Sequence, residues 1–102
     1  WMRYPVKPDG TLGAGEVFFD ATSDTRPGGP DGIKIDTKGN VYSAGPGGIW
    51  IFSPAGKHLG TILLPAVAGN FAWGGADHRT LYITMGSSVQ RVRLKISGLR
   101  AG

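Results

Sequence analysis

Short runs of alternating apolar and polar residues follow one another along the whole chain, and turn residues separate them. This period of two is typical of half-buried β-strands, and no window sustains the 3.6-residue period of a helix. Gly, Pro, Asp and Asn occupy the gaps between the runs, as in tight β-turns. The pattern therefore predicts an all-β fold of antiparallel sheets with no substantial helix. The runs predict strands over residues 2–6, 16–20, 31–36, 40–45, 49–54, 58–65, 70–75, 80–86 and 89–96.

The end of the chain repeats its middle at a spacing near 40 residues. Residues 33–54 align with residues 71–95, so that Ile33 matches Phe71 and Ile49 matches Val89, at offsets of 38 and 40. A unit of about 40 residues with about four strands is typical of a β-propeller blade. A solenoid or a plain sandwich repeat is the alternative.

The repeat divides the chain into three predicted parts. Residues 1–28 end one blade, residues 29–66 form a complete blade, and residues 67–102 form the next blade and a closing segment. About two and a half blades are fewer than the four to eight that close a propeller. We therefore expect either a fragment of a longer chain or association with copies or partners that complete the ring.

Composition narrows the classes of function. The 102 residues include 18 glycines and no cysteine, which excludes disulfides, Cys-ligated zinc and a thiol nucleophile. The net charge is +4, but Arg91, Arg93 and Lys95 alternate with apolar residues on one strand, which predicts a solvated strand face and no nucleic-acid site. No apolar run is long enough for a membrane span, and no Gly-x-Ser-x-Gly elbow or phosphate loop is present.

The tripeptide Pro-Asp-Gly occurs twice, at Asp9 and at Asp31. Asp9 falls opposite Ala55 in the repeat, in the turn between two outer strands, where Asp-Gly tolerates the backbone angles of a hairpin. Asp31 instead precedes the first strand of a blade, which is the innermost strand in a propeller. From the residues alone Asp31 is either a turn former or a functional carboxylate facing the channel.

Four further side chains have weaker assignments. Asn70 lies in the loop before the next inner strand and is either a substrate-binding group at the channel or an ordinary loop residue. Trp73 matches Ile35 in the repeat and is predicted to be a core residue. His58 and His78 lie in hairpin segments without metal-ligand spacing and are predicted to be surface residues.

Residues 28–65, followed by 71–84 and 91–98, resemble the C-terminal part of the SMP-30/gluconolactonase/luciferin-regenerating-enzyme-like family. The run "PDGIKIDTKGNVYSAGPGG" is the most specific part, whereas the turn from Asp36 to Asn40 also fits NHL-type repeats. The resemblance covers nearly the whole chain. It implies a six-bladed propeller about three times as long, and therefore that the N-terminal blades are absent here.

The resemblance also implies an activity, namely metal-dependent hydrolysis of a sugar lactone to an aldonic acid. It implies a divalent metal ion, calcium or zinc, held by a glutamate, an asparagine and the aspartate of Pro-Asp-Gly, which Asp31 matches. Glu16 lies in an outer strand and Asn70 in the wrong blade, so neither matches the other two ligands. Asp31 would also act as the general base or beside it. The alternative is an NHL-like segment that binds a partner without catalysis, in which Asp31 is only a turn residue.

Overall fold

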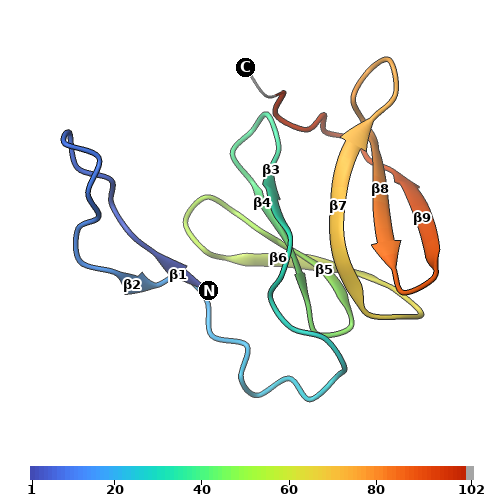
Figure 1. The fold of residues 1–102 in the computed structure, drawn as a ribbon, viewed down its shortest axis with the longest axis horizontal. Helices are drawn as coiled ribbons and strands as arrows, with labels where there is room; N and C mark the ends of the chain where they lie inside the picture. The colour runs from blue at the N-terminus through green and yellow to red at the C-terminus, as the bar shows by residue number, and fades with distance from the viewer. Residues whose placement is uncertain (101–102) are drawn as a thin grey trace.

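The computed structural model describes residues 1–100, which form nine strands and no helix (Figure 1). Since these residues contain no helix, none of them forms a helix long and apolar enough to cross a bilayer. All pairings between the strands are antiparallel, which confirms the predicted all-β class. The strands are β1 Met2–Arg3, β2 Glu16–Val17, β3 Ile33–Ile35, β4 Val41–Gly45, β5 Gly48–Phe52, β6 His58–Leu63, β7 Ala68–Gly74, β8 Thr80–Met85 and β9 Ser88–Arg93.

The strands form three sheets, ordered β1-β2, β3-β4-β5-β6 and β7-β8-β9. The register confirms the internal repeat, because Tyr42 pairs with Ile51 on β5 just as Tyr82 pairs with Arg91 on β9. The strands of the first sheet are shorter than predicted. Pairing stops near Pro5, because proline has no amide hydrogen to donate. Gly13 N still donates to Pro5 O at 2.8 Å. The third sheet has three strands within residues 1–100, and β9 ends at Arg93.

The main core lies between the second and third sheets. Tyr42, Ala44 and Ile49 from the second sheet are buried against aromatic and aliphatic side chains of β7 and β8. Tyr42 meets Trp73 edge-to-face at 4.8 Å, and Trp73 is 9% exposed, which confirms its predicted core position. Burial of each large apolar side chain contributes about 1.5–3 kcal/mol, so this core, which we call the seam, holds the two sheets in a fixed relative position. The partners from the third sheet are Ala68, Phe71, Trp73, Leu81, Ile83 and Met85.

The opposite face of the second sheet is covered by aromatic residues of the N-terminal segment. Trp1 lies 5.6 Å from Trp50 and 4.8 Å from Phe52, measured between ring centroids, and its Nε1 donates to Ser43 Oγ at 2.7 Å. Phe19 lies 5.2 Å from Phe52 by the same measure. Alternate residues of β5 therefore face different neighbours, as the period of two requires.

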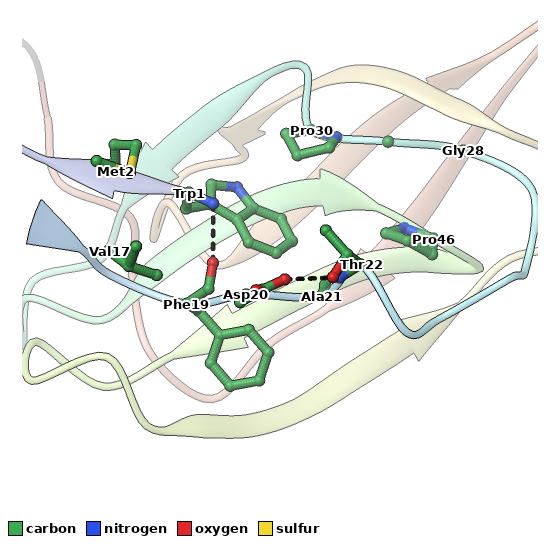
Figure 2. Close-up of a pocket in the computed structure, with 11 residues that line it drawn as sticks. Trp1, Met2, Val17, Phe19, Asp20, Ala21, Thr22, Gly28, Pro30 and Pro46 are labelled. Carbon is green, nitrogen blue, oxygen red and sulfur yellow. Dashed lines mark hydrogen bonds between the residues drawn. The ribbon is translucent and has the colours of Figure 1, made fainter.

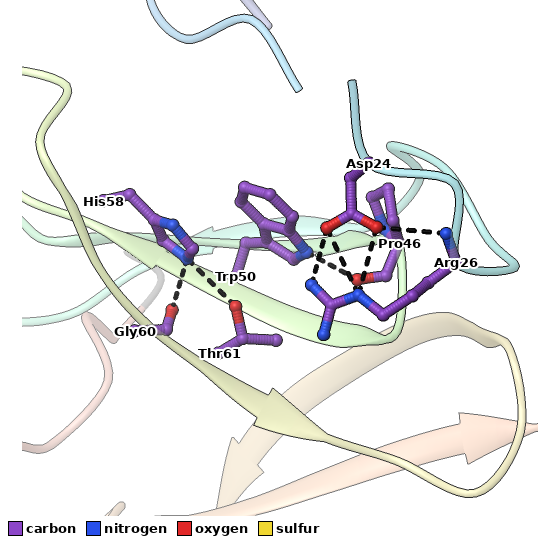
Figure 3. Close-up of polar contacts among 7 residues, drawn as sticks. All are labelled: Asp24, Arg26, Pro46, Trp50, His58, Gly60 and Thr61. Carbon is purple, nitrogen blue, oxygen red and sulfur yellow. Dashed lines mark hydrogen bonds and ion pairs between the residues drawn. The ribbon is translucent and has the colours of Figure 1, made fainter. Parts of the chain in front are cut away.

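The prediction that the histidines are surface residues is wrong for His58. His58 stacks on Trp50 at 4.2 Å, and its Nε2 lies 2.9 Å from both Gly60 O and Thr61 Oγ1 (Figure 3). His78 is also partly covered and occupies a turn with φ of 57°. The His58 side chain is structural, and the aromatic face that covers it is assembled from strands and loops distant in the sequence.

Candidate functional site

Asp31 lies at the end of the loop between β2 and β3, two residues before β3 begins. Its side chain is exposed and forms no hydrogen bond or ion pair with any residue from 1 to 100. Most other aspartates of the chain have a partner. Asp9, in the same tripeptide, accepts from Thr11 N at 3.0 Å and Thr11 Oγ1 at 2.6 Å, and these bonds lower the pKa of Asp9. The two Pro-Asp-Gly sequences thus differ: Asp9 bonds to its own turn, and Asp31 makes no such bond within residues 1–100.

Gly32 holds Asp31 in place through the backbone. Gly32 N donates to Gly69 O at 2.9 Å, and Gly32 O accepts from Ala44 N at 3.0 Å, so the residue joins the loop to β4 and to β7. A Cβ atom at position 32 would lie 2.8 Å from Asn70 Cγ and 2.9 Å from Asn70 Cα. Only glycine allows the two chains to approach this closely. We call these residues, Asp31, Gly32, Gly69 and Asn70, the Gly32 clasp.

The clasp brings Asp31 and Asn70 together where β3 and β7 begin, although they are 39 positions apart in the sequence. We call this edge of the two sheets the rim. A Cβ atom added to Gly69 would lie 4.0 Å from Asp31 Oδ2, so the carboxylate is directed toward the start of β7. Asn70 is exposed, and its Oδ1 accepts from Phe71 N at 2.9 Å. Asn70 Nδ2 donates to no group of residues 1–100 and is available to a ligand.

A β-bulge between Ala68 and Asn70 gives Asn70 its orientation. Thr84 Oγ1 lies opposite, where it accepts from Asn70 N at 3.2 Å and donates to Asn70 O at 3.1 Å. Bulges redirect a side chain without ending the strand. The contributions of Gly69 and Thr84 to the site are not apparent from the sequence, where the only local signal is the Gly-Asn pair at the beginning of a strand pattern.

Asp36, five residues after Asp31, has a structural role. It is 1% exposed, and Oδ1 accepts from Lys38 N at 2.9 Å and Asn40 N at 3.0 Å. Its Oδ2 accepts from Asn40 Nδ2 and from Tyr42 Oη, both at 2.9 Å. Burial, and secondarily this bond to Asp36, raise the pKa of Tyr42 above its ordinary value. With four bonds made, Asp36 has no capacity left for a ligand.

Asp31 is suited to bind a hard cation, because an exposed carboxylate beside amide and carbonyl oxygens is the donor type that calcium prefers and that zinc accepts. The rest of a ligand set is not supplied by residues 1–100, where no three His, Asp or Glu side chains converge. Glu16 pairs with Arg3 at 2.8 Å on β1 and β2, as expected for an outer-strand residue.

An apolar hollow of about 330 Å³ lies beside the loop that carries Asp31 (Figure 2). Its walls are the N-terminal strands, the loop from Phe19 to Thr22, and the segment from Gly28 to Pro30. Asp20 is the one acidic residue in its lining, and it accepts from Thr22 N at 2.9 Å, which lowers the pKa of Asp20. The hollow borders the rim but contributes no free reactive group to it.

Stacked antiparallel sheets with a carboxylate at the entrance of an inner strand define this chain as an all-β protein of propeller type. A solved structural-genomics target assigned as a gluconolactonase superimposes with a TM-score of 0.85 at 28% identity, over 98% of this chain and 33% of that one. A luciferin-regenerating enzyme gives a TM-score of 0.80 at 24% identity, over 94% of this chain and 38% of that one, and supports the fold alone.

Sequence comparison identifies the family. The model described as the SMP-30/Gluconolactonase/LRE-like region matches residues 1–87, and the chain belongs to this family. A gluconolactonase of Zymomonas mobilis subsp. mobilis is 42% identical over 70 residues, which are 68% of this chain and 20% of that protein. A 6-deoxy-6-sulfogluconolactonase of Pseudomonas putida is 38% identical over 85 residues, which are 80% of this chain and 29% of that protein. The chain thus spans less than a third of the length of either relative.

Proposed function

We propose that this chain is the Asp31-bearing part of a metal-dependent lactonase that hydrolyses a sugar lactone to an aldonic acid. One observation carries the proposal: Asp31 is exposed, without a partner among residues 1–100, and held at a rim by the Gly32 clasp. Carboxylates that serve only a turn make local bonds, as Asp9 does. The family and the names of the two relatives support lactone chemistry.

The proposed ligand set and the proposed arrangement of blades both extend beyond this chain. Residues 1–28, 29–66 and 67–102 would be the end of one blade, a complete blade and a further blade of a larger ring. The other blades would be supplied by more of the same polypeptide or by association of copies. Asp31 would provide one ligand of a calcium or zinc ion, and residues outside 1–102 would provide the others.

Each residue of the rim has a role in the proposed reaction. The cation, when bound, polarises the lactone carbonyl and lowers the pKa of its water. Asp31 would hold the ion and would take a proton from the attacking water, a step typically worth ~10²–10⁴ in rate. The water oxygen would bond to the carbonyl carbon, the ring C–O bond would break, and the proton taken up by Asp31 would pass to the released ring oxygen to give a hydroxyl. Asn70 Nδ2 donates to a sugar hydroxyl and so orients the ring.

The repeated tripeptide supplies a matched test. In the full-length protein, Asp31→Asn is expected to reduce hydrolysis of gluconolactone at least 100-fold and to weaken binding of calcium and zinc, measured by pH-stat and by calorimetry after chelation. Asp9→Asn is the control and should leave both unchanged, because Asp9 only closes an exposed hairpin. Full activity in Asp31→Asn would reject the lactonase proposal and favour a non-catalytic NHL-like binding module.

A further inference from the structure

A second pocket lies at the end of β3 and β7 that is opposite the rim. Its volume is about 340 Å³, and its apolar walls are Ile35, Ala72, Trp73 and Leu99. The segment that follows β9 forms one side, and Figure 1 shows this segment beside the ends of β3 and β7, close to the C-terminus. The titratable side chains of the lining are all basic, and we call the site the basic pocket. They are Lys34, His78 and Arg100.

Backbone hydrogen bonds fix the walls of the basic pocket. Leu99 N donates to Ile35 O at 2.9 Å, and Gly98 N donates to His78 O at 3.0 Å. The segment after β9 is thereby joined both to β3 and to the turn after β7. A Cβ atom at position 98 would overlap the indole of Trp73, so only glycine allows this close approach. The carbonyl oxygens of Ile35 and His78 are already bonded, so neither is a free acceptor at the pocket.

The free polar groups of the basic pocket are mainly donors. Neither the Lys34 ammonium nor the His78 ring forms a hydrogen bond or ion pair with any residue from 1 to 100. Within the same residues, Arg100 donates only to Ala76 O, at 3.4 Å. Trp73 Nε1 is buried and has no acceptor among them, although buried donors ordinarily have one.

The acidic residues close in sequence do not neutralise the basic pocket. Asp36 is occupied by its four hydrogen bonds, and Asp77 pairs with Arg93. The other two ion pairs within residues 1–100 use Arg3 and Arg26, so none of the three includes a residue of the pocket. A concave site lined by charges of one sign concentrates ions of the opposite sign. The basic pocket is therefore suited to an anion.

We propose that the basic pocket binds a small organic oxyanion through a carboxylate or phosphate group held by its three basic side chains. Ionised oxygens accept hydrogen bonds, and the planar guanidinium of Arg100 matches both groups. The carbon skeleton of the ligand lies against Ile35 and Leu99, which are 44% and 61% exposed. Such a ligand is either a sugar acid or a sugar phosphate. The site is separate from Asp31 and does not depend on lactonase activity.

Calorimetry on the full-length protein, freed of metal by chelation and dialysis, tests the proposal. The probes are inorganic phosphate, gluconate and glucose 6-phosphate, and glucose is the uncharged control. We expect one site per chain for each anion, and the tighter of the two sugar ligands identifies the source of the anionic group. Absence of binding by all three anions would overturn the proposal, as would equal binding of glucose, because charge would then play no part.

Matched substitutions locate the site. Lys34→Gln should weaken phosphate binding about 10- to 100-fold, because a hydrogen bond to a charged group is lost. Lys38→Gln removes the same charge four positions along the chain but outside the pocket, and should bind as the parent does. Asp31→Asn should also bind phosphate normally, which separates this site from the proposed metal site. Equal affinity in the two lysine variants would overturn the proposal; if Lys34→Gln fails to fold, Arg100→Gln serves the same comparison.

Trp73 provides a signal at the pocket itself. Saturation with phosphate should shift the indole N–H resonance of Trp73 in a nitrogen–proton correlation spectrum. The indole resonances of Trp1 and Trp50 should stay in place, because their Nε1 atoms already donate to Ser43 Oγ and Pro46 O, both at 2.7 Å. An unmoved Trp73 resonance at saturation would show that the anion binds elsewhere and would overturn the proposal.

Discussion

Asp31 and Asp36 lie at opposite ends of β3, and the same substitution should have very different consequences for stability at the two positions. Asp36→Asn keeps one oxygen for the amides of Lys38 and Asn40 but replaces the oxygen that accepts from Asn40 Nδ2 and from Tyr42 Oη. A hydrogen bond to a charged group contributes about 1.5–3 kcal/mol. Two such bonds are lost, and the Tyr42 hydroxyl recovers one by accepting from the new amide. The expected cost is therefore about 2–4 kcal/mol.

Asp31→Asn breaks no contact with residues 1–100, so its free energy of unfolding should stay within about 0.5 kcal/mol of the parent. Both variants can be compared with the parent by urea denaturation at pH 7, followed by tryptophan fluorescence, with stability taken from linear extrapolation. Because a domain of this size has only about 5–15 kcal/mol of net stability, the two outcomes are easily separated. Equal costs at the two positions would refute the assignment of Asp31 as a functional rather than structural carboxylate.

Two further predictions concern neighbouring groups. The pKa of Tyr42 is raised in the folded state above the unfolded value of 10.0, so the unfolded chain loses its proton first and stability should fall as pH rises above about 10. Tyr42→Phe should flatten that decline in urea midpoints measured from pH 9 to 11. An unchanged slope would show that Tyr42 does not cause the decline. Gly32→Ala would place a Cβ 2.8 Å from Asn70 Cγ, so we expect the free energy of unfolding to fall by about 1–3 kcal/mol and the side-chain amide resonance of Asn70 to shift. A variant with unchanged stability and an unmoved resonance would show that the clasp is not tightly packed.

The strands were predictable because each is a local pattern. The period of two and the turn residues are local signals, and the repeat shows the same signals twice. The register of Tyr42 with Ile51 and of Tyr82 with Arg91 follows from them. The error at His58 has a different origin. The residue is polar and adjoins a turn, but the ring that covers it, Trp50, lies on the neighbouring strand and on a face fixed only when the N-terminal aromatic residues pack.

The candidate site was only half predictable for a similar reason. The tripeptide and the family resemblance point to Asp31, whereas its proximity to Asn70 depends on the bond from Gly32, in the loop before β3, to Gly69 on β7 of the next sheet. No local pattern encodes the Gly32–Gly69 bond. It forms because the core between the second and third sheets fixes their relative position, and Gly32 then allows the close approach.

The position of Asp31 is therefore a property of the packing between sheets. The Gly32 clasp joins β4 to β7 at the rim, and directly below it Ala44 and Ala68 are buried in the seam that holds those sheets together. A carboxylate on a loop of this length would otherwise sample many positions, and a metal ligand gains affinity when it is preorganised.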